Sequence, residues 1–226
     1  MLELNLSDFE VRVLGSLAEK AFITPDTYPL SLNAVTMACN QVSNRDPVMQ
    51  LTDETVQQTL NALREKKLVR EWFPAGSRVP KFDHVLQDIC GLNEAQLAAL
   101  TLLMLRGPQT AGEIKGRSGR MHIFHEVERV EVTMQSLMND RETPLVIKLQ
   151  KAPGTKEARY AHLLSGERIV EMQGVAGSLL PPSSQAPTIA TKSDDRFSAL
   201  EDEVQQLRAE INWLSRQFEA FKKQFE

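Results

Sequence analysis

The sequence has 226 residues, of which 42% are hydrophobic and 25% charged, and its formal net charge at pH 7 is −4. The acidic balance excludes binding of nucleic acid by bulk positive charge, so any such contact must come from local patches. Two cysteines outside any CxxC pair, Cys39 and Cys90, argue against a disulfide scaffold and for a reducing compartment. Without a signal-peptide pattern or an apolar run of membrane-spanning length, the protein is expected to be cytoplasmic.

The first 86 residues predict three helices followed by a β-hairpin. Ser7 and Glu10 form a capping box at the start of the first helix, and Ser31 and Thr52 are N-cap residues for the second and third. Apolar residues recur at helical spacing, in the first helix at Phe9, Val13 and Leu17 and in the third at Val56, Leu60 and Leu63. Two strands are expected at 68–73 and 79–85. Three helices closed by a hairpin predict a winged-helix domain, with the third helix as recognition helix and the hairpin as wing.

The same order recurs in residues 87–166. A strongly apolar helix is followed by a second capping box, Thr110 with Glu113, and a third helix is expected at about 124–139. The strands that close this half are expected at 145–149 and 159–164. The buried residues of its third helix repeat the spacing of the first half and are Val130, Met134 and Leu137. Two copies at so long a period indicate a duplicated domain and not a solenoid.

After the second domain the composition changes. Residues 167–192 are rich in Gly, Pro, Ser and Ala and are interpreted as a flexible linker. In residues 193–226 apolar side chains alternate in steps of three and four, which predicts a parallel coiled coil that dimerises the protein. The seam residues are Phe197, Leu200, Val204, Leu207, Ile211, Leu214, Phe218 and Phe221. The expected fold is therefore mainly α with small β-hairpin wings: two tandem winged-helix domains, at 1–86 and 87–166, plus a C-terminal coiled coil.

Several segments resemble the YceH family of bacterial proteins. The most specific is the run TPDTYPLSLN at 24–33, which is followed by matching segments at 38–41 and 43–49. Segments 105–110 and 158–160 extend the resemblance into the second half. The resemblance implies a tandem winged-helix fold and implies no activity, cofactor or site residue.

Basic residues on the expected wings and helix ends form the candidate DNA-binding set. Wing cations are placed to meet phosphates, and polar side chains such as Gln57, Gln58 and Asn61 could face base edges. The candidate residues are Arg64, Lys67, Arg70, Arg78, Lys81, Arg117, Arg120, Lys151, Lys156 and Arg159. Carboxylates on the same third helices, Glu54 and Glu131 among them, would repel phosphate. Two functions are therefore open: a dimeric regulatory protein that binds duplex DNA, and a protein–protein docking module of a larger assembly without direct DNA contact.

Other chemistry-bearing residues favour structural roles. His122 and His125 lack a third ligand at metal-binding spacing, and Cys39 lacks a neighbouring base. Trp72 would be a binding anchor if exposed, but a core position is favoured. The polar segment 40–47 either lines a partner surface or holds the turn between helices through Asn and Asp side chains. The sequence contains no phosphate loop, nucleophile elbow or paired-carboxylate motif, so we expect a non-enzymatic protein with no catalytic residue, metal or cofactor.

Overall fold

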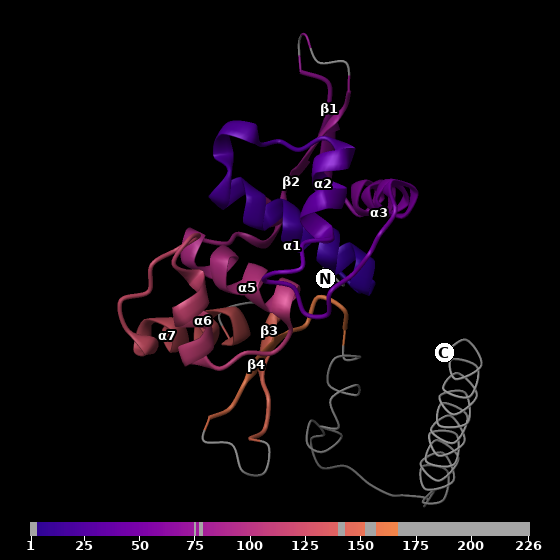
Figure 1. The fold of residues 1–226 in the computed structure, drawn as a ribbon. Helices are drawn as coiled ribbons and strands as arrows, with labels where there is room; N and C mark the ends of the chain where they lie inside the picture. The colour runs from indigo at the N-terminus through magenta and orange to yellow at the C-terminus, as the bar shows by residue number, and fades with distance from the viewer. Residues whose placement is uncertain (1–3, 75, 77–78, 140–142, 152–156, 167–226) are drawn as a thin grey trace, which may run out of the picture. The chain divides into compact units, whose positions relative to one another are not determined.

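A computed structural model describes residues 4–74, 76, 79–139, 143–151 and 157–166. Within them the chain is mainly helical, with seven α-helices, one 3₁₀ turn and two separate two-stranded antiparallel sheets (Figure 1), which confirms the predicted mainly α class with small hairpins. The elements in chain order are α1 (Asp8–Ile23), η1 (Pro25–Thr27), α2 (Leu32–Cys39), α3 (Asp53–Glu65), β1 (Val69–Trp72), β2 (Lys81–His84), α4 (Leu86–Cys90), α5 (Glu94–Arg106), α6 (Ala111–Ser118), α7 (Val127–Asn139), β3 (Val146–Lys148) and β4 (Tyr160–His162).

Most of the longer helices begin where the sequence supplies a side-chain cap. At the start of α1 the Ser7 hydroxyl accepts from the Glu10 N–H at 3.3 Å, and the Glu10 carboxylate accepts from the Ser7 N–H at 2.8 Å. This reciprocal pair satisfies two backbone donors that have no partner inside the helix. Side-chain caps also begin four further helices, at Ser31, Thr52, Asn93 and Thr110.

The two halves of the described chain repeat the same backbone pairing. Each hairpin receives one extra residue from the segment just before the second helix of its half. Leu30 exchanges two backbone hydrogen bonds with Phe82, of 3.1 and 2.8 Å, and Gln109 exchanges two with Tyr160, of 3.0 and 2.7 Å. Because the N-cap of α2 follows Leu30 and the N-cap of α6 follows Gln109, the two halves match in register as well as in order.

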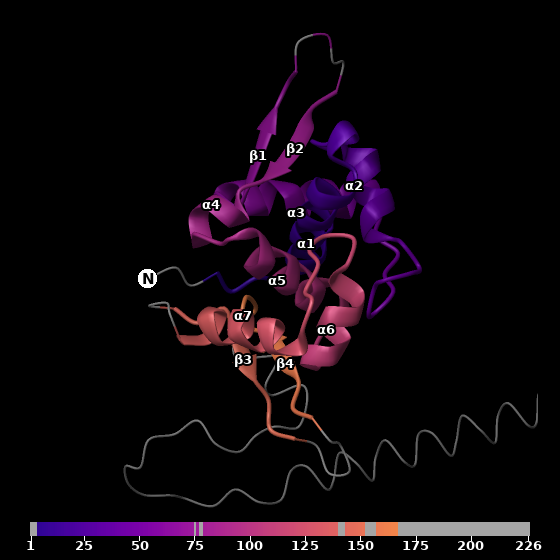
Figure 2. The same cartoon turned by 90° about the vertical axis from the view of Figure 1, so that its left-hand side faces the viewer.

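The halves are joined through their first helices, α1 and α5, which lie side by side in both views (Figures 1 and 2). The two helices approach so closely that a Cβ placed on Gly15 would stand 3.0 Å from Leu105 Cδ2. The backbone adds two links, from the Asp46 N–H to the Leu105 carbonyl at 2.9 Å and from the Leu6 N–H to the Leu164 carbonyl at 2.8 Å. One continuous cluster of buried apolar side chains spans both halves, so each half is stabilised partly by the other.

Two aromatic side chains that the sequence placed in the core are exposed. Val13 and Leu17 are fully buried, but Phe9, one turn earlier on the same face of α1, is 46% exposed. Helical spacing shows which residues share a face, but not how far along the helix its neighbours cover that face. Trp72 is 48% exposed. It lies two residues from Arg70, so both side chains are on the same face of β1, and that face is the exposed one.

The element boundaries also differ from expectation. The strands are one or two residues shorter at each end, and α7 begins at Val127 and not near 124. The short helix α4 was not predicted, since it has no side-chain cap; it ends at Gly91, whose φ of 57° is left-handed.

Some of the predicted features lie outside the described residues. These are the linker at 167–192, the coiled coil at 193–226 with its seam, and two of the candidate DNA-binding cations, Arg78 and Lys156. In the part that is described, no helix combines the length and the apolar character needed to span a bilayer.

Candidate nucleic-acid interface

Helix α3 carries a row of polar side chains on its outer face. Its buried face is the predicted one, formed by Val56, Leu60 and Leu63. On the outer side the Gln57 amide donates to Asn61 Oδ1 at 3.2 Å, and Arg64 Nη1 donates to the same oxygen at 3.5 Å. Asp53 and Glu54 occupy the first turn, where a carboxylate interacts favourably with the helix N-terminus. Beyond that turn, three residues that can donate hydrogen bonds follow one another along the helix.

Ion pairs continue this surface onto the β1–β2 hairpin. Arg64 pairs with Glu71 on β1, and Arg70 Nη2 lies 2.8 Å from Asp83 Oδ2 on β2. The Tyr28 hydroxyl donates to the other oxygen of Asp83 at 2.8 Å, and burial raises the pKa of Tyr28, which keeps this donor protonated. The positive charges of Arg64 and Arg70 are therefore partly compensated within the chain.

Lys67 and Lys81 differ from these arginines, because neither makes an ion pair with another described residue. Lys67 is exposed just after α3, in the left-handed region at a φ of 59°. Lys81 begins β2 and faces Trp72 across the hairpin. Lys66, by contrast, is held by Glu10 at 2.7 Å. In the first half, Lys67 and Lys81 are thus the described candidates whose charge is available to a ligand.

In the second half, two of the candidate cations, Arg117 and Arg159, make hydrogen bonds that stabilise the fold. Arg117 Nη1 donates to Gln109 Oε1 at 2.8 Å, and Arg159 Nη1 donates to the Pro108 carbonyl at 2.8 Å. Both guanidinium groups also contact the Glu113 carboxylate, at 3.4 Å from Arg117 and 3.2 Å from Arg159. Because these bonds tie α6 to β4, the two arginines have a structural role that does not depend on a partner.

The groove between α7 and the β3–β4 hairpin has mixed charge. It encloses about 210 Å³ and is lined by Lys148 and Lys151, but also by Glu131 and Glu157. Lys148 Nζ lies 5.4 Å from the centre of the Tyr160 ring, at cation–π distance. Two carboxylates beside two lysines give this groove no net positive charge, so it is a poor site for phosphate.

Comparison with known proteins identifies the family. Residues 6–155 match the family model described as "Protein of unknown function, DUF480". The chain belongs to the DUF480 family. It is 47% identical to a UPF0502 protein of Herminiimonas arsenicoxydans, over 96% of this chain and 89% of that protein. A UPF0502 protein of Pelobacter propionicus is 44% identical over the full length of both chains. The family resemblance predicted from segment 24–33 is confirmed, and since these names carry no activity, function has to be argued from geometry.

In this member of the DUF480 family, the polar segment 40–47 is held by side-chain hydrogen bonds at two points. The Asn40 amide accepts from the Leu51 N–H at 2.7 Å and donates to the Leu51 carbonyl at 2.8 Å, which agrees with the turn-holding role, one of the two alternatives left open by the sequence. Sequence reasoning missed the second anchor, a buried two-point pair between Arg45 and Glu19 with nitrogen–oxygen distances of 2.6 and 3.1 Å. The two residues belong to different elements, and no spacing rule connects them.

The remaining candidate residues of this DUF480 protein, Cys39 and His122 among them, show no reactive arrangement within the described part of the chain. Cys39 is fully buried, and burial raises the pKa of its thiol to about 11, so the thiolate needed for nucleophilic chemistry is scarce at neutral pH. His122 Nδ1 lies 3.8 Å from Glu94 Oε1, and its ring packs edge to face on Phe124 at 4.7 Å. Over the described ranges, no three potential metal ligands come together.

Proposed function

We propose that the chain is a tandem winged-helix protein of the reducing cytoplasm that binds duplex DNA in a regulatory role as a dimer. The fold interpretation is supported by the order of three helices and an antiparallel hairpin in each half, with an extra bridging residue before the second helix. Helices α3 and α7 are then the recognition helices, and the β1–β2 and β3–β4 hairpins are the wings. The proposed domains are 1–86 and 87–166, and among the described residues neither Cys39 nor Cys90 is part of a disulfide.

The observation that best supports DNA binding is the continuous polar surface that runs from α3 to the first wing. Gln57, Asn61 and Arg64 form a hydrogen-bonded row on α3, and the Arg64–Glu71 ion pair carries it onto the hairpin. Amide and guanidinium groups in this arrangement are the side chains that read base edges in the major groove. Lys67 and Lys81 supply the phosphate-directed charge beside it. The first domain is therefore proposed as the main DNA-contacting unit, since the equivalent groove of the second contains Glu131 and Glu157.

Fluorescence anisotropy with a duplex of mixed sequence tests this proposal. We expect the wild-type chain to bind at low salt and to lose affinity steeply as salt rises, because neutralised phosphates release counterions. The variant Lys67→Gln/Lys81→Gln should weaken binding to all sequences and reduce the salt slope by about 2. A matched control, Lys148→Gln/Lys151→Gln on the second wing, should change the slope less. Absence of binding at low salt, or equal effects of the two double variants, would contradict the proposal.

A second candidate function is protein docking through the first wing. Trp72 is 48% and Phe73 68% exposed on the hairpin, and exposed aromatic side chains are frequent anchors of protein interfaces. The compensation of Arg64 and Arg70 by carboxylates also lowers the charge offered to DNA. A pull-down from nuclease-treated lysate separates the two functions. A protein partner that survives nuclease and is lost with Trp72→Ala supports docking, whereas loss of all captured material on nuclease treatment supports DNA binding.

Dimerisation is proposed to come from the heptad seam of residues 193–226, which lies outside the described residues. Sedimentation of the full chain and of a chain ending at Lys192 measures its contribution. We expect a dimer for the full chain and a monomer for the shortened one. If both have the same oligomeric state, the seam is not the dimerising element.

A further inference from the structure

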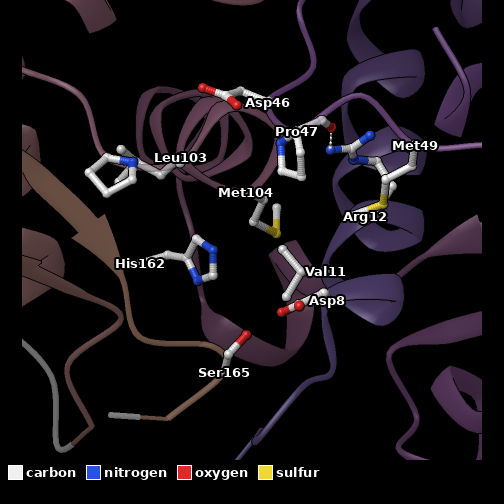
Figure 3. A pocket seen from close by; sticks show the side chains of 12 residues that line it. Asp8, Val11, Arg12, Asp46, Pro47, Met49, Leu103, Met104, His162 and Ser165 are labelled. Carbon is white, nitrogen blue, oxygen red and sulfur yellow. Dashed lines mark hydrogen bonds between the residues drawn. The ribbon is translucent and has the colours of Figure 1, made fainter. Parts of the chain in front are cut away.

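A cavity of about 230 Å³ lies where the two halves meet, with its walls drawn from both (Figure 3). Helix α1 forms one wall of the cavity, and segment 46–49 forms another. The last turns of α5 with Gly107 and Pro108, and the segment 162–165 at the end of β4, complete it. The volume is just below the range of drug-sized pockets, so the occupant it fits is a small molecule.

The cavity wall is apolar along its middle. Arg12 and Asp46 line it on the side of segment 46–49, and Asp8, His162 and Ser165 form a polar end opposite them. Figure 3 shows the imidazole of His162 beside the hydroxyl of Ser165, with the carboxylate of Asp8 directed toward the same space. The apolar part of the wall includes Val11 and Met104. An apolar body with a few polar groups that orient the ligand is typical of small-molecule sites, and the polar end of this cavity supplies such groups.

Two of the polar groups at this end are buried and have no hydrogen-bond partner among the described residues. His162 is 5% and Ser165 4% exposed, and neither His162 Nδ1 nor Ser165 Oγ is paired within that part of the chain. Leaving such a group unpaired costs about 1–3 kcal/mol, so two of them within the wall of one cavity point to a ligand toward which these side chains turn to pair. Burial lowers the pKa of His162 to about 4, so its ring is neutral at physiological pH and one nitrogen is free to accept.

The residue of the first half that corresponds to His162 is His84, and its surroundings are different. His84 closes the β1–β2 hairpin opposite Val69, as His162 closes β3–β4 opposite Val146. His84 packs edge to face on the Tyr28 ring at 6.2 Å and does not line this cavity. Both histidines have a buried Nδ1 without a partner among the described residues, so that feature belongs to the repeated fold, whereas the position of His162 in the wall of this cavity is particular to the second half.

We propose that this cavity binds a small primary amine with an apolar body, with its ammonium group between Asp8, Ser165 and His162. An ammonium has three N–H donors, and these three side chains offer three acceptors, one of them charged. The apolar body lies against Val11 and Met104. This site is independent of the DNA-binding proposal, because none of its residues belongs to α3 or to the first hairpin.

The charge at the polar end favours an amine over a carboxylate ligand. Among the described residues, Asp8 is the one charged group at that end, and it would repel an anion. Arg12 also lines the cavity, but its two terminal nitrogens donate to the Cys39 carbonyl at 3.2 Å and the Pro47 carbonyl at 2.6 Å. Figure 3 shows the guanidinium of Arg12 turned toward Pro47, away from Asp8 and Ser165. Its positive charge is thus engaged by backbone carbonyls and does not reach the polar end.

Calorimetric titration of the full chain with three matched probes tests the assignment: phenethylamine, 2-phenylethanol and 3-phenylpropanoate. We expect the amine to bind about tenfold or more tightly than the alcohol, because a hydrogen bond to a charged group is worth more than a neutral one. The carboxylate should bind least. Equal affinities for the amine and the alcohol, or no binding of the amine at millimolar concentration, would overturn the proposal.

Two variants with a matched control locate the site. Asp8→Asn should weaken amine binding about tenfold or more. Asp53→Asn should leave it unchanged, since Asp53 is likewise the first residue of its helix but does not line the cavity. Ser165→Ala should weaken amine binding and at the same time raise the free energy of unfolding of the unliganded protein, because it removes an unpaired buried hydroxyl. Equal effects of Asp8→Asn and Asp53→Asn would show that the amine binds elsewhere.

Discussion

Replacing Gly15 by alanine tests whether the two halves are held together by close contact between α1 and α5. The new Cβ would stand 3.0 Å from Leu105 Cδ2, 3.1 Å from Met104 Cβ and 3.2 Å from Leu105 Cγ. Carbon atoms normally pack about 3.5–4.0 Å apart. Leu105 Cδ2 can rotate away, but Met104 Cβ and Leu105 Cγ lie next to the α5 backbone, so the helices themselves must separate. Overpacking of this kind costs about 1–3 kcal/mol, against a gain of about 1 kcal/mol from removing a glycine from a helix.

Gly116→Ala is the matched control, because Gly116 lies within α6 and a Cβ there would have no described atom within 4 Å. It should raise the free energy of unfolding by about 1 kcal/mol through helix propensity alone. The free energy of unfolding of Gly15→Ala should then be about 1–3 kcal/mol lower than that of Gly116→Ala. Urea unfolding of the full chains at pH 7, followed by circular dichroism, measures this difference. If the two variants have the same stability, the helices are not in the close contact that the structure shows, and the reasoning is refuted.

Three further predictions concern polar groups in the core. Arg45→Ala should lower the free energy of unfolding by about 3–5 kcal/mol, because it leaves the buried Glu19 carboxylate without its partner; urea unfolding should show Arg45→Met/Glu19→Leu to be less destabilised. Tyr28→Phe should cost about 1–2 kcal/mol in the same assay, since it removes the hydroxyl that donates to Asp83; a neutral effect would contradict that bond. The pKa of His162 is lowered from 6.5 to about 4, so the unfolded chain binds a proton that the folded chain does not. The free energy of unfolding should therefore fall by about 3 kcal/mol in total as the pH drops from about 6.5 to 4. Urea unfolding midpoints measured over this range should fall less for His162→Gln than for the wild-type chain.

The local features of this fold could be predicted from the sequence, because their causes lie within a few residues. Ser7 and Thr110 cap helices by hydrogen bonds to an N–H three residues further on, so both the cap and its partner are visible in one short window. The buried faces of α3 and α7 follow from apolar residues at helical spacing, as at Val56 and Val130. Because these signals recur in the second half of the sequence, they also indicate the duplicated order of elements.

The state of each candidate cation was decided by tertiary structure. Arg70 and Lys81 look equivalent in the sequence, but folding brings Asp83 against Arg70 and leaves Lys81 without an ion pair among the described residues. Trp72 shares a strand face with Arg70, and only the packing of the hairpin shows that this face is open. Charge pairing across strands depends on register, which residue type alone does not specify.

By itself, the sequence determined the order of the longer helices and of the strands, where most of those helices start and which family the chain belongs to. The packing of α1 against α5 determined the rest, because it brings together groups from opposite ends of the described chain. Asp8 begins the first helix, and His162 and Ser165 lie at the end of the last strand, so no sequence window contains them all. Their convergence on one cavity depends on how closely the two halves approach, and that distance is set by the absence of a side chain at Gly15.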